Sequence, residues 1–438
     1  MTSPVRTEAI RGLLRRLPLF VLAGFVAAAS AAGPGTARPP ARPNILFVMA
    51  DDLGWGELGC YGNTFNETPH LDRLAAAGMR FTDAYAAAPV CSPTRASIMT
   101  GQAPARAAIT DFLPAVTDTY LEPDAHTTLN EALAAAGYVT GMIGKWHLDT
   151  DFEEHRGHPV RHGFDEVIGS ETRYIGPGDY FFPYDRAETL GNGTEGEFLT
   201  DRLFSEARAF ARRHRNRPFF LAVNLYAVHR RLDAPAELAE KYRRKYEDRH
   251  GPGSAAPFFR GRSHPGKPDN PWLAAMLERI DAGVGGLLDV LETLGIADNT
   301  VVVFFSDNGG ARAVANNGGL RQGKTWLYEG GIRDPLLVQW PGTVRPGSVT
   351  DTPVYSTDFY PTFLEMAGAP APTGQVLDGQ SLVPVLRGRA LSPRRLYWHY
   401  PADTGNWRDR AAAAVRSGPH KLLESYGDDG DELDDLDP

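Results

Sequence analysis

The sequence has few cysteines, no apolar stretch of membrane-spanning length and no excess of positive charge. Only two of its 438 residues are cysteines, Cys60 and Cys91, which excludes a disulfide-rich scaffold. The apolar run at residues 17–29 is too short to cross a bilayer comfortably. Lys and Arg number 45 against 54 Asp and Glu, a formal charge of −9. No nucleic-acid partner is therefore expected, and an anionic substrate would need a locally positive pocket.

The first residues have the pattern of an export signal. Arg11, Arg15 and Arg16 precede the apolar run, and Ala29-Ser30-Ala31 matches a small-residue cleavage site. Residues 32–42 are rich in Pro, Gly and Ala and form a linker. We therefore expect a signal peptide at 1–31 and an exported mature chain, periplasmic or extracellular. No cysteine stands directly after the cleavage site, so a lipid anchor is not expected, and stable membrane insertion of the mature chain is not expected either.

Two apolar runs end in oxygen-bearing side chains. Residues 44–50 are followed by Asp51 and Asp52, and residues 300–306 by Asp307 and Asn308. Both runs are typical of buried parallel strands, whose carboxyl ends hold ligand sites in open α/β sheets. Oxygen ligands of this kind suit Ca²⁺ or Mg²⁺. The alternative for the paired aspartates is a turn that caps a helix.

The segment Val90-Cys91-Ser92-Pro93-Thr94-Arg95 runs from a loop into a helix. Pro93 suits the first helical position, so Cys91 is expected just before a helix N-terminus, where free N–H groups attract an anion. A cysteine there is a reactive group or its product. Two alternatives remain: a half-buried structural cysteine, and a Cys60–Cys91 disulfide in an exported protein.

Several basic side chains follow predicted strands or lie in a glycine-rich loop. Lys145 and His147 come after the strand at 138–144 and would share one face of extended backbone. His229 follows the strand at 219–225, and Lys324 ends the glycine-rich stretch 317–324. Together with Arg95 these side chains suit an anionic ester beside a divalent cation. The alternatives are a solvated strand end for Lys145 and His147, and a structural role for His229.

The pattern of the whole chain predicts an α/β protein with a large, mostly parallel central sheet flanked by helices. From residue 387 it changes to short strands at 396–400, 412–416 and 421–425, with an acidic end at 428–437 that we expect to fray. We therefore predict a catalytic domain at 43–386 and a small C-terminal α+β subdomain at 387–438.

Six stretches of the chain resemble the formylglycine-dependent type I sulfatases of the alkaline phosphatase superfamily, and they occur in the same order as in that family. The most specific is C-S-P-T-R at 91–95, which fits the C-x-P-x-R signature. The six stretches are PNILFVMADDLGWGELGCYG, TPHLDRLAAAGMRFTDAYAAAPVCSPTRASIMTG (which contains this signature), GYVTGMIGKWHL, the segment around His229, VVVFFSDNGG, and GKTWLYEGGIRDPLLVQWPG.

The resemblance implies a role for each candidate residue. A maturation enzyme would oxidise Cys91 to formylglycine, whose hydrate supplies the nucleophilic hydroxyl. One Ca²⁺ would be held by residue 91 together with Asp51, Asp52, Asp307 and Asn308. Arg95 and His147 would steady the hydrate, Lys145 and Lys324 would bind the sulfate, and His229 would protonate the leaving alcohol. Asp307 is a candidate base for the attack, and His147 for the release of sulfate from the sulfated hydrate.

The substrate is the least specified part. Aromatic side chains stack on sugars and arginines pair with anions, so the candidate substrate residues are Arg173, Arg230, Arg231, Trp326 and His399. LYWHYP and AAVRSGPHKLL resemble carbohydrate-active sulfatases, which favours a sulfated sugar. Asp334 stands where the family commonly has an apolar residue. The competing functions are a phosphate or phosphonate ester hydrolase on this scaffold, and a non-catalytic glycan-binding protein with unconverted Cys91.

Overall fold

The computed structural model describes residues 42–114, 118–149, 156–170, 180–184, 187–261, 268–402, 408–427 and 430–436. The predicted signal peptide and the candidate Arg173 lie outside these residues. Within the described part of the chain, no helix has the length and apolarity needed to cross a membrane.

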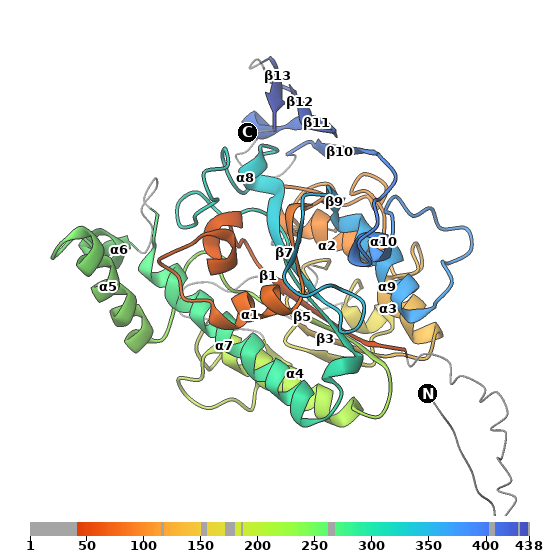
Figure 1. Ribbon diagram of the computed structural model, residues 1–438, viewed down its shortest axis with the longest axis horizontal. Coiled ribbons are helices and arrows are strands. Elements are labelled where there is room, and N and C mark those ends of the chain that lie inside the picture. Colours follow the sequence, from red (N-terminus) through yellow and green to blue (C-terminus); the bar gives the residue numbers. More distant parts are fainter. Residues whose placement is uncertain are drawn as a thin grey trace, which may run out of the picture. The chain divides into compact units, whose positions relative to one another are not determined.

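The centre of the fold is a nine-stranded sheet in the order β4-β3-β5-β1-β6-β7-β2-β8, with β9 also paired to β2 (Figure 1). Pairing is parallel from β4 to β6 and antiparallel on both sides of β7. The predicted mostly parallel sheet is confirmed. Its strands are β1 Asn44–Ala50, β2 Met79–Tyr85, β3 Val139–Gly144, β4 Glu166–Ile168, β5 Phe219–Asn224, β6 Thr300–Ser306, β7 Arg333–Gln339, β8 Ser348–Thr350 and β9 Val354–Tyr355.

Helices cover both faces of this sheet, which explains why β1, β5 and β6 are continuous apolar runs. Alternate residues of β1 point to opposite sides: Leu46 and Val48 enter one core, Ile45 and Phe47 the other. The first core includes α1, α4, α5 and α7, with α4 and α7 side by side (Figure 1). The second includes α2, α3, α9 and α10. The helices are α1 Pro69–Ala77, α2 Cys91–Thr100, α3 Leu129–Ala135, α4 Leu199–His214, α5 Ala236–His250, α6 Ala256–Gly261, α7 Pro271–Thr293, α8 Glu329–Ile332, α9 Phe359–Ala367 and α10 Val383–Leu386.

Helix α2 begins two residues earlier than its proline suggested. Cys91 is its first residue and Val90 the N-cap, so Pro93 is the third helical residue. Proline is tolerated there because the first-turn N–H groups have no partner within the helix. All ten residues of α2 are buried, although its composition is largely polar. The helix is therefore an internal support of the site, with Cys91 in its first turn.

The C-terminal residues form a separate four-stranded antiparallel sheet in the order β10-β11-β12-β13. The prediction of a frayed acidic end was wrong for β13, which pairs with β12. The carboxylate of Glu432 in β13 forms an ion pair with Arg321 and accepts a hydrogen bond from Tyr328 Oη at 2.8 Å. These two partners compensate the negative charge of that residue. The strands are β10 Arg395–Tyr400, β11 Ala412–Ser417, β12 His420–Ser425 and β13 Asp431–Asp435.

One face of this small sheet packs against the chain that leads to Cys91. Residues of β10 alternate between exposed and buried, so that Leu396, Trp398 and Tyr400 face inward. They join a hydrophobic cluster with Tyr85 and Val90. Trp398 Nε1 also donates to the carbonyl oxygen of Ala86 at 2.9 Å. The C-terminal sheet is thus fastened to the loop between β2 and α2.

Candidate active site

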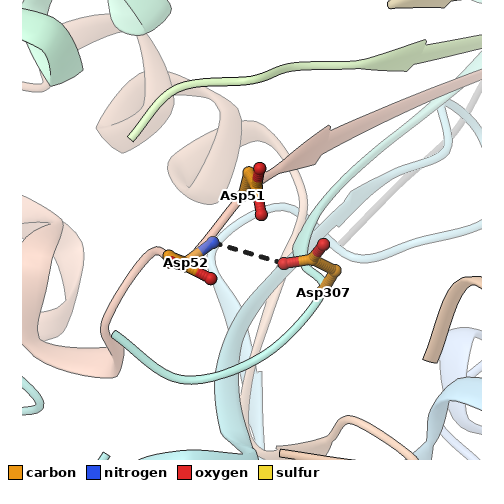
Figure 2. A group of neighbouring side chains, drawn as sticks. All are labelled: Asp51, Asp52 and Asp307. Carbon is orange, nitrogen blue, oxygen red and sulfur yellow. Dashed lines mark hydrogen bonds between the residues drawn. The ribbon is translucent and has the colours of Figure 1, made fainter. Parts of the chain in front are cut away.

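Four of the five predicted metal ligands, Asp51, Asp52, Asp307 and Asn308, meet at one edge of the sheet because β1 and β6 are parallel neighbours. Ala50 pairs with Ser306, so the next residues of both strands emerge side by side. Oxygens of Asp51, Asp52 and Asp307 all lie within 4.8 Å of one another, and Figure 2 shows the three side chains converging. The backbone N–H of Asp52 donates to Asp307 Oδ1 at 3.2 Å, and Asn308 Nδ2 to Asp52 Oδ1 at 2.8 Å.

Three oxygens of this cluster are buried without a hydrogen bond to any described residue: Asp51 Oδ1, Asp52 Oδ2 and Asn308 Oδ1. Leaving a buried oxygen unpaired is costly, and several at one place fit a divalent cation that prefers oxygen ligands. Burial raises the pKa of Asp51 to about 7; Lys145 opposes this, and the nearby Asp307 and Asp52 add to it. A bound cation would offset the repulsion between the carboxylates and lower their pKa values, so that the cluster stays ionised.

Each carboxylate is paired with one cation. Lys145 Nζ lies 2.7 Å from Asp51 Oδ2, and Lys324 Nζ lies 2.5 Å from Asp52 Oδ1. Arg95 donates to Asp307 Oδ2 from Nε at 2.9 Å and from Nη2 at 2.6 Å.

At Asp52, neighbouring basic groups outweigh the effect of burial on the pKa of the carboxyl group. Burial alone would raise the pKa of Asp52, but Lys324, His229 and Lys145 together bring it well below its ordinary value. The site therefore alternates positive and negative groups, as the binding of both a metal ion and an anionic ester requires.

Cys91 faces His147 at the start of α2. Its Sγ lies 3.1 Å from His147 Nδ1, and His147 Nε2 lies 3.0 Å from the carbonyl oxygen of Leu113. Because a carbonyl only accepts, Nε2 carries the proton and Nδ1 is left as an acceptor towards residue 91. Burial, followed by Lys145, lowers the pKa of His147 well below its ordinary value. The imidazole is therefore a neutral base at residue 91.

The structure brings Lys145 and His147 together in a different way from the extended backbone that was predicted. His147 has φ +58°, in the left-handed region. The two side chains therefore reach the site from an irregular segment after β3. Arg95 Nη1 fixes this segment by donating to the carbonyl oxygen of Lys145 at 2.7 Å.

The disulfide alternative is excluded, because Cys60 and Cys91 are both free thiols. Cys60 packs against the first core, whereas Cys91 faces His147. Burial raises the pKa of Cys91, with Lys145 and Lys324 opposing. The unmodified thiol is therefore protonated near neutral pH and is a weak nucleophile.

His229 completes the group on the side of Asp52. Its Nε2 lies 3.8 Å from Asp52 Oδ2, and 18% of its side chain is exposed. Backbone hydrogen bonds between Asp51 and the segment at Ala227 and Val228 place it there. Burial, followed by Lys324, lowers the pKa of His229 well below its ordinary value. An anionic ester at this place would shift that pKa back upward.

The proposed substrate residues are not brought together to the same extent. Arg230 and Arg231 follow His229 and are exposed. Trp326 is half-buried two residues from Lys324, with the guanidinium of Arg410 4.9 Å from its ring centroid. His399 lies on the exposed face of β10, opposite Trp398, and contacts Tyr426 Oη at 2.7 Å. The period-two alternation of β10 thus directs His399 away from the face that packs towards Cys91.

Two residues support the site in roles that sequence reasoning did not predict. Tyr180 Oη donates to the carbonyl oxygens of Tyr226, at 2.9 Å, and His229, at 3.0 Å. As an aromatic residue in a stretch without periodicity, Tyr180 is a sequence candidate for lining an outer substrate pocket, but it is buried and supports the segment that carries His229. Ser306 Oγ accepts from the N–H of Leu53 at 3.0 Å and donates to the carbonyl oxygen of Asn308 at 3.0 Å. A polar residue ending an apolar strand was the available signal for Ser306.

Asp334 of β7 is a fully buried carboxyl group that the site does not use. Neither of its oxygens has a well-formed hydrogen bond to a described residue, since the nearby N–H of Ala86 donates to the carbonyl oxygen of Ile332 at 2.8 Å. Burial, followed by Asp307, raises the pKa of Asp334 well above its ordinary value, although the Ala86 amide opposes this. Ionisation of the Asp334 carboxyl is therefore disfavoured, and this buried polar group is a local cost to stability.

Asp334→Val is expected to raise the free energy of unfolding by about 1 kcal/mol, since it removes an unsatisfied buried group and suits a strand. Thermal unfolding at pH 7 measures this effect. Asp334→Asn is the control and should bring no gain, because it keeps a buried polar group of the same shape. A lower melting temperature for Asp334→Val would mean that the carboxyl has a stabilising partner.

Comparison with known protein families agrees with this geometry. Residues 43–369 match the family described as Sulfatase, and residues 321–438 match the C-terminal region of N-sulphoglucosamine sulphohydrolase. The chain is 36% identical over 405 residues to N-acetylgalactosamine-6-sulfatase of Canis lupus familiaris, covering 86% of this chain and 72% of that protein. It is 36% identical over 403 residues to arylsulfatase A of Homo sapiens, covering 90% and 76%.

Among solved structures, Ps i-CgsB in complex with k-i-k-neocarrahexaose has a TM-score of 0.74 and 31% identity, covering 90% of this chain and 86% of the other. A phosphonate monoester hydrolase from Silicibacter pomeroyi shares the fold, with a TM-score of 0.65, 22% identity and coverage of 90% and 89%. The sulfatase match extends over most of the chain and includes both strands that carry the acidic cluster. The chain therefore belongs to the sulfatase family, the type I sulfatases of the alkaline phosphatase superfamily.

Proposed function

We propose that this sulfatase removes sulfate from a sulfated carbohydrate with the help of one Ca²⁺ and a formylglycine made from Cys91. One observation carries the proposal. Three buried carboxylates, each paired with a cation, lie beside a helix start whose first residue faces a neutral histidine. Negative groups for a metal ion and positive groups for an ester are thus present at one place.

Asp51, Asp52 and Asn308 would hold the Ca²⁺ through their unpaired buried oxygens. Asp307, whose oxygens lie within 4.8 Å of those of Asp51 and Asp52, would complete the ligand set. When bound, the ion supplies positive charge that polarises a sulfate oxygen and favours an ionised hydroxyl nearby. The ion pairs of the three carboxylates with Lys145, Lys324 and Arg95 fix the orientation of these ligands before any ion binds.

Residue 91 would bear the attacking hydroxyl, because a hydrated aldehyde carries two hydroxyl groups and can release sulfate without attack of water on sulfur. Nδ1 of His147 is the acceptor for a proton from that residue, and Leu113 keeps the other ring nitrogen protonated. Cys91 is 2% exposed, so the maturation enzyme must act before α2 is buried. That enzyme is a proposed partner of the unfolded chain.

The ammonium groups of Lys145 and Lys324 would bind the sulfate oxygens, because each already lies beside the acidic cluster at hydrogen-bond distance. His229, which is partly exposed beside Asp52, would donate a proton to the leaving oxygen. Its low pKa makes the protonated imidazole a strong acid, and the bound anion favours its protonation.

A sugar sulfate is the favoured substrate class for two reasons. One structural relative, Ps i-CgsB, was solved in complex with k-i-k-neocarrahexaose, and one curated relative is named N-acetylgalactosamine-6-sulfatase. In this chain, the half-exposed Trp326 offers an aromatic face two residues from Lys324. Export by the N-terminal signal would place the enzyme where extracellular polysaccharides are found.

Release of sulfate from sulfated oligosaccharides by the matured enzyme tests the proposal, with nitrophenyl sulfate and nitrophenyl phosphate as reference substrates. We expect free sulfate from both sulfate esters and little phosphate, because the residues match sulfatases throughout. Turnover of the phosphate ester above that of the sulfate ester would favour the phosphate or phosphonate hydrolase instead. The shared fold of the phosphonate hydrolase makes this comparison necessary.

His229→Ala is expected to slow turnover more for a substrate with a poor leaving group than for one with a good leaving group. Turnover of a sugar sulfate should fall about 10²- to 10⁴-fold, because an alkoxide needs a proton, whereas nitrophenyl sulfate should lose less than about ten-fold. Parallel kcat measurements on the two substrates check this. His420→Ala, at an exposed position of β12, is the control. Equal losses on both substrates would contradict proton donation by His229.

A further inference from the structure

The ammonium of Lys324 is placed by a segment without regular secondary structure. Residues 321–328 lie between β6 and the short α8, yet Lys324 Nζ reaches Asp52 Oδ1 at 2.5 Å. Backbone bonds anchor the segment at Lys324, whose N–H donates to Gly310 O at 3.1 Å, and at Thr325, whose N–H donates to Pro89 O at 2.8 Å. At the two ends of the segment, Gly330 N donates to Arg321 O and Gly331 N to Tyr328 O. A segment of this kind needs further contacts to hold a side chain in one position.

Lys421 of β12 supplies such contacts from the C-terminal sheet. Its side chain is fully buried, and Nζ donates to the carbonyl oxygen of Leu327 at 2.6 Å and to Glu329 Oε1 at 2.8 Å. Leu327 is three residues from Lys324 and Glu329 begins α8. A buried ammonium is stable only when paired, so these two contacts fix the end of the segment.

The carboxylate of Glu329, which contacts Lys421, also contacts β2, the strand that precedes Cys91. Glu329 Oε2 accepts a hydrogen bond from Tyr85 Oη at 2.7 Å, and Arg416 of β11 donates to Tyr85 Oη. Arg416 also pairs with Asp83 Oδ2 at 2.7 Å. The buried network thus joins β2, α8, β11 and β12.

A second contact from the C-terminal part of the chain reaches the residue next to Lys324. Arg410 donates to Thr325 Oγ1, and its guanidinium lies 4.9 Å from the centroid of the Trp326 ring. A cavity of about 20 Å³ lies beside these contacts and is lined by Trp326, Arg410 and Leu423, among others. The contacts of Arg410 thus add to those of Lys421 in holding the segment against the C-terminal part of the chain.

We infer that Lys421 is a positioning residue for the sulfate-binding ammonium of Lys324. By holding Leu327 and Glu329, it fixes the course of the chain after Lys324, so that the C-terminal sheet forms part of the sulfate-binding site without touching sulfate. This inference rests on the proposed function, in which Lys324 binds the sulfate group.

The test compares Lys421→Met with Arg395→Met in the matured, calcium-loaded enzyme, with inorganic sulfate as the probe. Methionine keeps the apolar stem of Lys421 and removes its ammonium, and Arg395 is an exposed residue of β10 in the same sheet. We expect Lys421→Met to weaken sulfate binding about 10- to 100-fold and to raise KM more than it lowers kcat, because a small displacement of a binding group is costly. Arg395→Met should match the unsubstituted enzyme.

The same substitution in a Lys324→Ala background separates positioning from general destabilisation. If Lys421 acts through Lys324, then Lys421→Met changes sulfate affinity less than about two-fold once Lys324 is absent. An equal loss in both backgrounds, or no loss in the first, overturns the inference. Glu329→Gln replaces Lys421→Met if the latter does not fold. Absence of sulfate binding by the unsubstituted enzyme would instead contradict the proposed function.

Discussion

Cys91→Ala is expected to lower sulfate release by about 10⁴-fold or more, because alanine has no thiol and cannot be oxidised to the formylglycine whose hydrate bears the nucleophilic hydroxyl. Alanine fits the buried first turn of α2 without strain, so the fold and the ion pairs around it should persist. The rate of sulfate release from a sulfated oligosaccharide measures the effect.

Cys60→Ala is the matched control, since Cys60 is the other cysteine and faces the first core away from His147. It should keep full activity. Affinity for the sulfated ligand should survive in Cys91→Ala, because Lys145 and Lys324 are unchanged. If Cys91→Ala released sulfate as fast as the unsubstituted enzyme, residue 91 could not be the source of the nucleophile. The glycan-binding alternative predicts retained affinity and no sulfate release from either the unsubstituted chain or the variant.

The mass of the peptide that contains Cys91 provides a direct check. Conversion replaces the CH₂SH side chain by CHO and lowers the mass accordingly. We expect the converted peptide from a host that has the maturation enzyme. An unmodified thiol from such a host, together with full activity, would contradict the role of formylglycine.

Removal of divalent cations is expected to abolish turnover and to lower the melting temperature at pH 7. Asp51, Asp52 and Asp307 crowd their oxygens within 4.8 Å, so their repulsion is relieved by an ion and returns without it. An ion present at about 1,000 times its dissociation constant contributes about 4 kcal/mol of stability. Melting curves with chelator, and again after adding Ca²⁺, measure the shift without reference to activity.

Asn308→Ala isolates the metal from the surrounding ion pairs, because it removes the unpaired Oδ1 and leaves all three carboxylates with their cations. The variant should need more Ca²⁺ to reach half of the stabilisation. Asn299→Ala, just before the opposite end of β6, is the control and should bind Ca²⁺ unchanged. A melting temperature that does not respond to Ca²⁺ in the unsubstituted protein would rule out the metal site.

The sequence alone predicted the parts of the site that depend on local order along the chain. A buried strand must end where its apolar run ends, so Asp51 and Asp307 could be assigned to strand tips before any pairing was known. The loop before Cys91 and the helix after it were also predicted, although proline placed the helix start two residues late. Neighbouring parallel strands then brought the oxygens together as expected.

Only the tertiary structure decided which charges pair and which residues face the site. The packing of distant segments decides that Lys145 contacts Asp51 and that Asp334 is buried. It also decides that His399 lies on the face of β10 that points away from Cys91. The contact of Lys421 with the chain beyond Lys324 spans 94 residues. Such contacts leave no period in the sequence, because strand pairing and side-chain burial are set by the whole fold rather than by neighbours along the chain.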